Sequence, residues 1–121
     1  MTRKAFLDYC EGLEGAVLDC PFPMDALTTV ARHEKNRRWF AILMQKDGAD
    51  FANLKCEPAQ GALMRASFQG IRPGYHMNKE HWISVFLDSD VPPDIIKKLV
   101  LDSHALTAPK MRRVKLKQEI T

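Results

Sequence analysis

Two segments of the sequence concentrate side chains that can bind an anion. The first runs from Arg32 to Arg38 and holds four basic residues and one acid. Several cations at the tip of a hairpin can contact the phosphates of a nucleic acid backbone. A solvated turn whose charges prevent aggregation has the same composition, so both interpretations stay open. The candidate phosphate ligands here are Arg32, Lys35, Arg37 and Arg38.

The second segment, Tyr75–Trp82, places a tyrosine, two histidines, an asparagine, a lysine and a tryptophan within eight residues. Asparagine can hydrogen-bond to bases or backbone, lysine can pair with a phosphate, and aromatic rings can stack on bases. The alternative is structural: Trp82 begins a strand and belongs to the core, and the histidines bond locally. The candidate binding residues here are His76, Asn78, Lys79 and His81.

Signals for catalysis or for a metal site are weak. Cys10 lies on the apolar face of an expected helix, which is typical of packing. Cys20 and Cys56 lie where a thiol pKa can be lowered, but nothing couples either to a histidine. The five-residue spacing of His76 and His81 is not that of helical metal ligands, and no phosphate-binding glycine motif is present. We therefore expect no enzyme activity, no cofactor and no bound metal.

Length and charge bound the class of protein. The chain has 121 residues, of which 45% are hydrophobic and 27% charged, as in one soluble globular domain. Residues 110–121 contain five of the 18 basic residues and one of the 15 acids, which leaves residues 1–109 with a net charge of −1. We expect a domain over residues 1–107 and a basic tail over 108–121. Three unpaired cysteines and the lack of an apolar leader or spanning segment favour a cytoplasmic, non-membrane protein, with a monomer preferred.

The elements that must position these candidates follow from periodicity. A first helix is expected after Thr2, its N-cap, with an apolar stripe of Phe6, Tyr9, Cys10 and Leu13. Short strands are expected at 16–19, 27–31, 39–44, 51–55 and 82–87, with a further short one near residue 71. The run 39–44 is apolar throughout, which predicts a central strand covered on both faces.

Two more helices complete the pattern. One should begin near Pro58 and bury Ala59, Ala62, Leu63 and Ala66. Another should start at Pro92-Pro93, be capped by Asp90, and bury Ile96, Leu99, Val100 and Ser103. Strands joined by short loops favour an antiparallel sheet. The fold class is therefore α+β, with two layers: a sheet of five to six strands and helices on one face.

These motifs resemble the MmcQ/YjbR family of small bacterial proteins over residues 3–107. The most specific match is the run Pro-Gly-Tyr-His-Met-Asn-Lys-Glu-His-Trp at 73–82. Other matching segments are 13–16, 21–22, 39–43 and 54–58, together with the closing helix.

The resemblance implies a fold similar to CyaY, the bacterial frataxin, and a "DNA-binding, double-wing" label. This description of the family implies that two wing-like hairpins contact DNA. Asn78, Lys79 and His81 fall within the family signature, and Arg32–Arg38 suits one wing. That loop is longer and more basic here than the common pattern. The resemblance does not carry frataxin-like iron binding, because the acids of the first helix and strand are few and mixed with basic residues.

The leading hypothesis is a non-enzymatic DNA-binding protein that contacts phosphates through these hairpins. The alternative is a protein-interaction or small-ligand module, favoured by the near-neutral body of the chain. Basic segments on one side of the domain would favour DNA binding. Basic segments on different sides would contradict it. A closed pocket lined by Tyr75, His76 and Trp82 would favour a ligand. Metal binding of the frataxin type is a third hypothesis.

Overall fold

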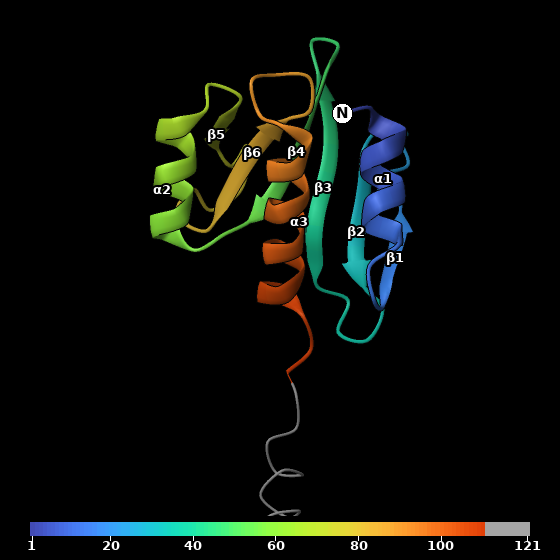
Figure 1. The fold of residues 1–121 in the computed structure, drawn as a ribbon. Helices are drawn as coiled ribbons and strands as arrows, with labels where there is room; N and C mark the ends of the chain where they lie inside the picture. The colour runs from blue at the N-terminus through green and yellow to red at the C-terminus, as the bar shows by residue number, and fades with distance from the viewer. Residues whose placement is uncertain (111–121) are drawn as a thin grey trace, which may run out of the picture.

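A six-stranded antiparallel sheet forms the centre of the fold in the computed structural model, which describes residues 1–110 (Figure 1). The strands follow the order β1-β2-β3-β4-β6-β5. The class is α+β, as predicted. Residues 111–121 of the expected basic tail lie outside the described residues. In chain order the elements are α1 (Arg3–Glu11), β1 (Ala16–Asp19), β2 (Thr29–His33), β3 (Trp39–Lys46), β4 (Ala49–Lys55), α2 (Pro58–Ser67), β5 (Ile71–Pro73), β6 (Trp82–Phe86) and α3 (Pro93–Thr107).

The sheet has a helix-covered face and a helix-free face. In Figure 1, α1 lies in front of β1 and β2, α3 lies in front of β3 and β4, and α2 lies beside β5. Leu54 and Ile83 are paired neighbours in the core that the helices cover. Side chains alternate along a strand, so Phe51, Asn53, Ser84 and Phe86 project from the opposite face.

The first and last helices form as their patterns predict. The Thr2 hydroxyl accepts a hydrogen bond from the Ala5 amide, and Phe6 and Cys10 are buried. The four predicted positions of α3, Ile96, Leu99, Val100 and Ser103, are all buried. The Ser103 hydroxyl donates to the Phe40 carbonyl and accepts from the Lys55 amide, so it joins α3 to two strands.

The predicted cap of α3 is wrong. Pro92 occupies the N-cap position, and no side chain caps the helix. The Asp90 carboxylate instead accepts hydrogen bonds from the Gln69 and Gly70 amides, each at 2.8 Å. These bonds hold the pKa of Asp90 below its ordinary value. Asp90 therefore fastens the exit of α2 to the start of α3.

The predicted buried stripe of α2 is also wrong. Ala59, Ala62, Leu63 and Ala66 are exposed, with 60% of the Leu63 surface accessible. The buried residue is Gly61, where a Cβ atom would lie 2.8 Å from the Cys56 sulfur. Because the backbone of α2 approaches the sheet at this glycine, the contact face is not the face with the most apolar residues.

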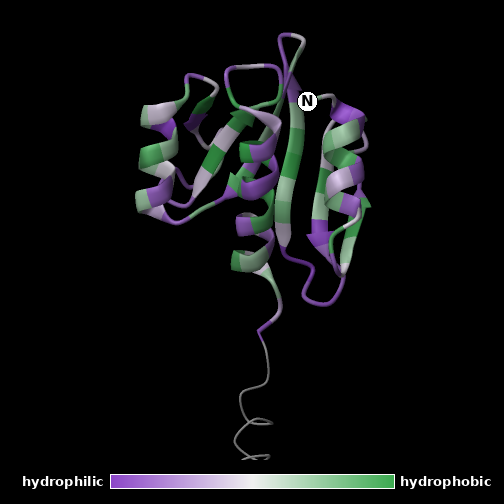
Figure 2. Cartoon of the chain, viewed as in Figure 1, coloured by the Kyte–Doolittle hydropathy of each residue, from purple (hydrophilic) through white to green (hydrophobic). Residues whose placement is uncertain are grey.

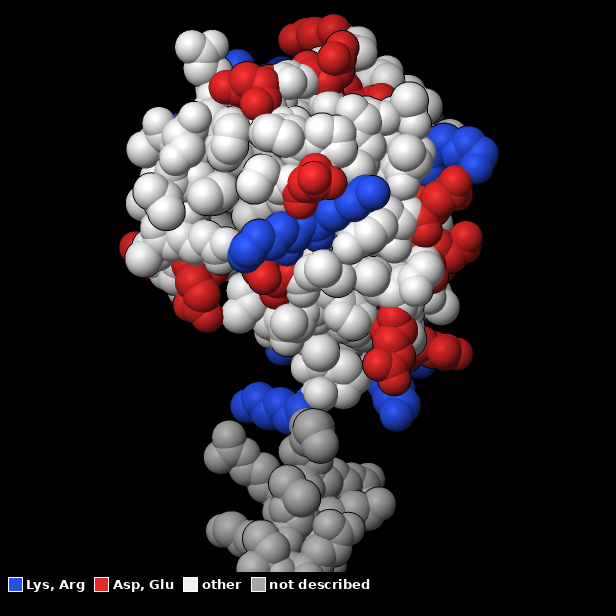
Figure 3. Space-filling model, in the orientation of Figure 1, with Lys and Arg blue, Asp and Glu red and all other residues white. Residues whose placement is uncertain are grey.

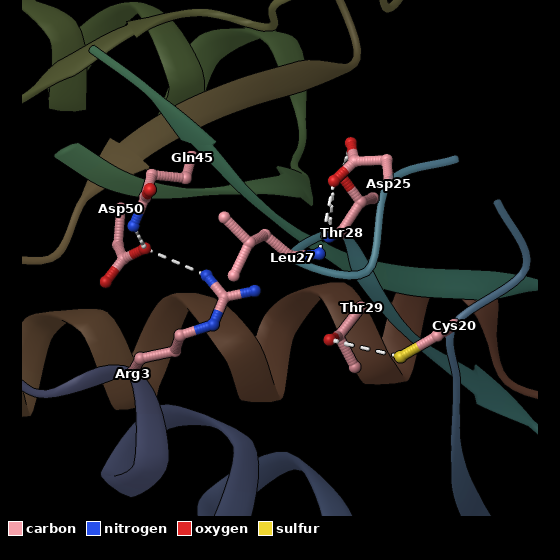
Figure 4. A network of polar contacts seen from close by, with 8 residues as sticks. All are labelled: Arg3, Cys20, Asp25, Leu27, Thr28, Thr29, Gln45 and Asp50. Atoms are coloured by element: carbon pink, nitrogen blue, oxygen red, sulfur yellow. Dashed lines mark hydrogen bonds and ion pairs between the residues drawn. The ribbon is translucent and has the colours of Figure 1, made fainter. Parts of the chain in front are cut away.

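The strands differ in detail from their predicted bounds. Strand β2 begins two residues later than expected, because Asp25 forms a turn that accepts hydrogen bonds from the Leu27 and Thr28 amides (Figure 4). Strand β3 lies inside the sheet as predicted, but Trp39 at its start is 37% exposed. No helix within residues 1–110 is long and apolar enough to cross a membrane.

Candidate nucleic-acid interface

The predicted basic hairpin is the connection between β2 and β3, which Figure 2 shows as a continuous hydrophilic loop. Arg32 is part of β2, where its guanidinium forms an ion pair with Asp19. Lys35, Arg37 and Arg38 lie on the loop and are exposed. Three of the four predicted cations are therefore available to an anion, and the charge of Arg32 is compensated.

Contacts with the last turn of α3 hold this loop in place. The Asn36 side chain donates to the Thr107 carbonyl at 2.9 Å and accepts from the Arg38 amide at 3.0 Å. Arg37 adopts a φ of 62°, a left-handed conformation that is costly for a residue with a Cβ. The loop therefore presents its cations from a defined backbone.

An exposed aromatic pair lies next to the hairpin. Trp39 follows Arg38 directly, and its ring packs edge-to-face against Phe22 with the centroids 6.1 Å apart. Phe22 is 43% exposed and Trp39 is 37% exposed. The sequence pattern placed Trp39 in a covered strand, so this pair was missed as a candidate site. The adjacent run Arg37-Arg38-Trp39 is a signal that could have identified it.

In the Tyr75–Trp82 segment, two predicted ligands instead shape the loop. The Lys79 ammonium donates to the Gly74 carbonyl at 2.9 Å. The Asn78 side chain accepts from the Glu80 amide, and its main-chain carbonyl accepts from the His81 and Trp82 amides. Asn78 and Lys79 therefore close the turn before β6.

The two histidines of this segment are exposed. His76 has a φ of 58°, and its ring lies 4.0 Å from that of Tyr75. The main-chain carbonyl of His81 accepts a hydrogen bond from the Cys56 amide. Trp82 is half-buried at the start of β6. His76, Asn78, Lys79 and His81 are all exposed, and Asn78 and Lys79 each also make a hydrogen bond within the loop.

Topology brings the hairpin and the His81–Trp82 end of the second segment to the same end of the sheet. Strand β2 ends and β3 begins at this end, and β5 ends and β6 begins there too, because neighbouring strands are antiparallel. Three strand spacings separate β2 from β6, which corresponds to about 14 Å. Helix α3 ends beside the hairpin, as the Asn36–Thr107 contact shows. The hairpin and His81 thus share one end of the domain, whereas Tyr75 lies on the helix-free face, held by Asn53 and Ser84.

The surface charge at this end is mixed. In the view of Figure 3, Lys and Arg side chains lie at the lower end of the molecule, and acidic side chains lie immediately above them on one side. No continuous basic surface covers this face. An anion would therefore be bound locally at the lower end rather than across the whole helix-covered face.

The buried cysteines have no catalytic environment. Burial raises the pKa of Cys10 to about 12 and also raises the pKa of Cys56 above its ordinary value. The thiolate is the nucleophilic form, so burial disfavours nucleophilic chemistry at both. Cys20 is exposed, and its sulfur lies 3.6 Å from the Thr29 hydroxyl (Figure 4). Residues 1–110 contain no cluster of three or more potential metal ligands.

A cavity of about 340 Å³ opens on the helix-free face. Of the three residues expected to line a ligand pocket, Tyr75 lines this cavity, and His76 and Trp82 do not. Lys46 and Arg72, which no sequence motif singled out, line it as well. Their positions in the sequence are 26 residues apart, so only the pairing of the strands brings them together.

Comparison with known proteins gives consistent matches. A family model described as YjbR matches residues 11–106. The chain is 32% identical to YyaQ of Bacillus subtilis (strain 168) over 117 residues, which cover 88% of this chain and 98% of YyaQ. It is 34% identical to YjbR of Escherichia coli (strain K12) over 104 residues, covering 86% and 85% of the two chains.

Solved structures agree with this match. The crystal structure of a Pseudomonas syringae protein has a TM-score of 0.81 and 34% identity, and the match covers 89% of this chain and all of that one. A Deinococcus radiodurans protein with a DUF419 domain has a TM-score of 0.79 and 30% identity, with 97% and 86% covered. The similarity therefore extends over nearly the whole fold.

Proposed function

The chain belongs to the YjbR family, and from this premise we propose that it is a non-enzymatic DNA-binding protein that contacts phosphates through the β2–β3 hairpin. The observation that carries the proposal is the set of three exposed cations, Lys35, Arg37 and Arg38, on one anchored loop. None of them forms an ion pair with an acid of residues 1–110. A preformed loop orders fewer side chains on binding, which favours affinity.

The proposal takes a second contact from the His81 end of the Tyr75–Trp82 segment, which lies at the same end of the sheet. His81 supplies an exposed hydrogen-bonding group there, and His76 supplies one beside Tyr75. Asn78 and Lys79 support the loop that carries the two histidines, and both side chains are exposed, so the proposal keeps them as contacts as well.

The C-terminal sequence adds to this arrangement. Residues 110–121 carry five basic residues and one acid. They follow α3, whose last turn contacts the hairpin. The proposal therefore assigns to this stretch additional phosphate contacts without sequence preference.

The salt dependence of binding to duplex DNA tests the proposal. Each phosphate contact contributes about 0.9 to the slope of log K against log salt concentration. The variant Lys35→Gln/Arg37→Gln/Arg38→Gln should therefore lose about 2–3 units of slope. A matched control, Lys4→Gln/Lys97→Gln/Lys98→Gln, removes the same charge from α1 and α3 and should keep most of the slope.

Two results would contradict the proposal. One is the absence of binding by the full chain at about 50 mM salt. The other is an equal loss of affinity in the two triple variants, which would mean that only net charge matters. A chain ending at Pro109 separates the contribution of the C-terminal sequence from that of the hairpin.

A further inference from the structure

The cavity on the helix-free face is separate from the hairpin. It lies between the β3–β4 turn and the paired strands β5 and β6, at the level where Phe51 pairs with Phe86. The hairpin lies at the opposite end of β3. A volume of about 340 Å³ is at the lower end of the range for small-molecule sites, about 300–1,000 Å³. It would hold a ligand of one or two rings.

Three aromatic rings form a row in this cavity. Phe51 is the central ring and is 2% exposed. The Tyr75 ring meets it edge-to-face with the centroids 5.7 Å apart, and the tilted Phe86 ring lies 5.2 Å from it. Stacked and edge-on rings are the arrangement that a further planar ring can extend.

A cation lies over each outer ring of the row. The Lys46 ammonium is 4.8 Å from the Tyr75 ring centroid, and the Arg72 guanidinium is 5.0 Å from the Phe86 ring centroid. Neither cation has an ion-pair partner in the part of the chain that the structure describes. Asp47 is the one acid among the lining residues, so the cavity carries a net positive charge.

Buried hydrogen bonds hold Tyr75 against the sheet. The Asn53 side chain donates to the Tyr75 carbonyl at 2.9 Å, and the Tyr75 amide donates to the Ser84 hydroxyl at 2.9 Å. Ser84 in turn donates to the side-chain amide oxygen, Oδ1, of Asn53. The wall of the cavity that Tyr75 forms is therefore positioned before any ligand arrives.

We infer that this cavity binds a small planar aromatic anion. Its ring packs against the row of Phe51, Phe86 and Tyr75, and its carboxylate or phosphate group lies between Lys46 and Arg72. The aromatic row alone would accept any flat apolar molecule. The two cations select a ring that carries a negative charge, because a charge-assisted hydrogen bond is about twice as strong as a neutral one.

Chemical-shift mapping on the full chain tests the inference with four probes. Adenosine 5′-monophosphate and indole-3-acetate combine a ring with an anion, whereas adenosine and inorganic phosphate supply one part each. At least one of the first pair should bind more tightly than both of the second, with shifts centred on the Lys46, Arg72 and Tyr75 amides. The variants Lys46→Gln and Arg72→Gln should each weaken that binding about tenfold.

Matched variants decide the outcome. Lys98→Gln on α3 removes one charge from the helix-covered side and should leave the affinity unchanged. Arg72→Gln should keep DNA binding, and the hairpin triple variant should keep binding of the aromatic anion. The inference is overturned if neither aromatic anion shifts these amides at about 10 mM. It is equally overturned if Arg72→Gln and Lys98→Gln bind the anion with the same affinity.

Discussion

The imidazole of His33 and the hydroxyl of Thr107 are hydrogen-bonded at 2.9 Å across 74 residues of sequence. The Thr107 hydroxyl donates its own proton to the Ser103 carbonyl at 2.8 Å. The Nε2–H group of His33 must therefore be the donor, which requires this nitrogen to be protonated. This pair fastens the base of the basic hairpin to the end of α3.

Stability should fall as the pH drops below about 6.5, the ordinary pKa of histidine. Burial lowers the pKa of His33, and the neighbouring His104 and Arg38 lower it further. Between the folded pKa and the unfolded value the unfolded chain binds more protons, so the free energy of unfolding decreases with decreasing pH. Thermal melts between about pH 7.5 and 5.5 measure this change.

The matched variant is His33→Gln, which keeps a side-chain N–H donor but does not titrate. Its melting temperature should depend less on pH over this interval than that of the parent chain. An identical pH dependence in both proteins would mean that His33 is not the responsible group.

Replacing Arg37 by glycine should raise stability and weaken DNA binding at the same time. Its φ of 62° is costly for a residue with a Cβ, so Arg37→Gly should raise the free energy of unfolding by up to about 1 kcal/mol. The loss of one cation should lower the salt slope by about 0.9. Lys35→Gly removes a charge from the same loop where no positive φ is present, and it should not stabilise the protein. Urea denaturation compares the two variants.

Gly61→Ala should destabilise the protein although alanine is the better helix former. The added Cβ would meet the Cys56 sulfur at 2.8 Å and the Ile83 methyl at 3.4 Å. Such overpacking costs about 1–3 kcal/mol, more than the gain of about 1 kcal/mol in helix propensity. In a Cys56→Ala background the sulfur is absent, so the same substitution should cost clearly less. An equal loss of stability in both backgrounds would show that contact with the sulfur is not the cause.

Ser84→Ala should loosen the Tyr75 wall of the cavity. The substitution leaves the Tyr75 amide and the side-chain oxygen Oδ1 of Asn53 without their partner, in a site where Ser84 is 2% exposed. Unpaired buried polar groups cost about 1–3 kcal/mol. Hydrogen exchange at the Tyr75 amide should accelerate, and urea denaturation should show the lower free energy of unfolding. Ser67→Ala on the exposed side of α2 is the control and should change stability by less than about 0.5 kcal/mol.

The sequence predicted the elements whose signals are local. The apolar spacing of α1 and α3, the apolar run of β3 and the Asp47-Gly48 turn all report on neighbouring residues, and the structure confirms these elements. The prediction failed for α2, because its contact with the sheet depends on the close approach at Gly61 rather than on the number of apolar side chains.

For the candidate site, the sequence identified the two segments but not which of their side chains have partners within the fold. Lys35, Arg37 and Arg38 are exposed as expected. Arg32 is paired with Asp19, and the exposed Lys79 ammonium donates to the Gly74 carbonyl; composition can assign neither partner. His76 and His81 remain accessible on a loop that Asn78 closes.

By itself, the sequence determined the fold class, most strand and helix positions, and the basic character of the hairpin. Each of these follows from the type and spacing of residues within one element. The tertiary structure alone decided that the hairpin is fastened to α3 and that Lys46 and Arg72 face one cavity. The physical reason is that such contacts join residues tens of positions apart, and strand register and helix docking, rather than local periodicity, bring them together.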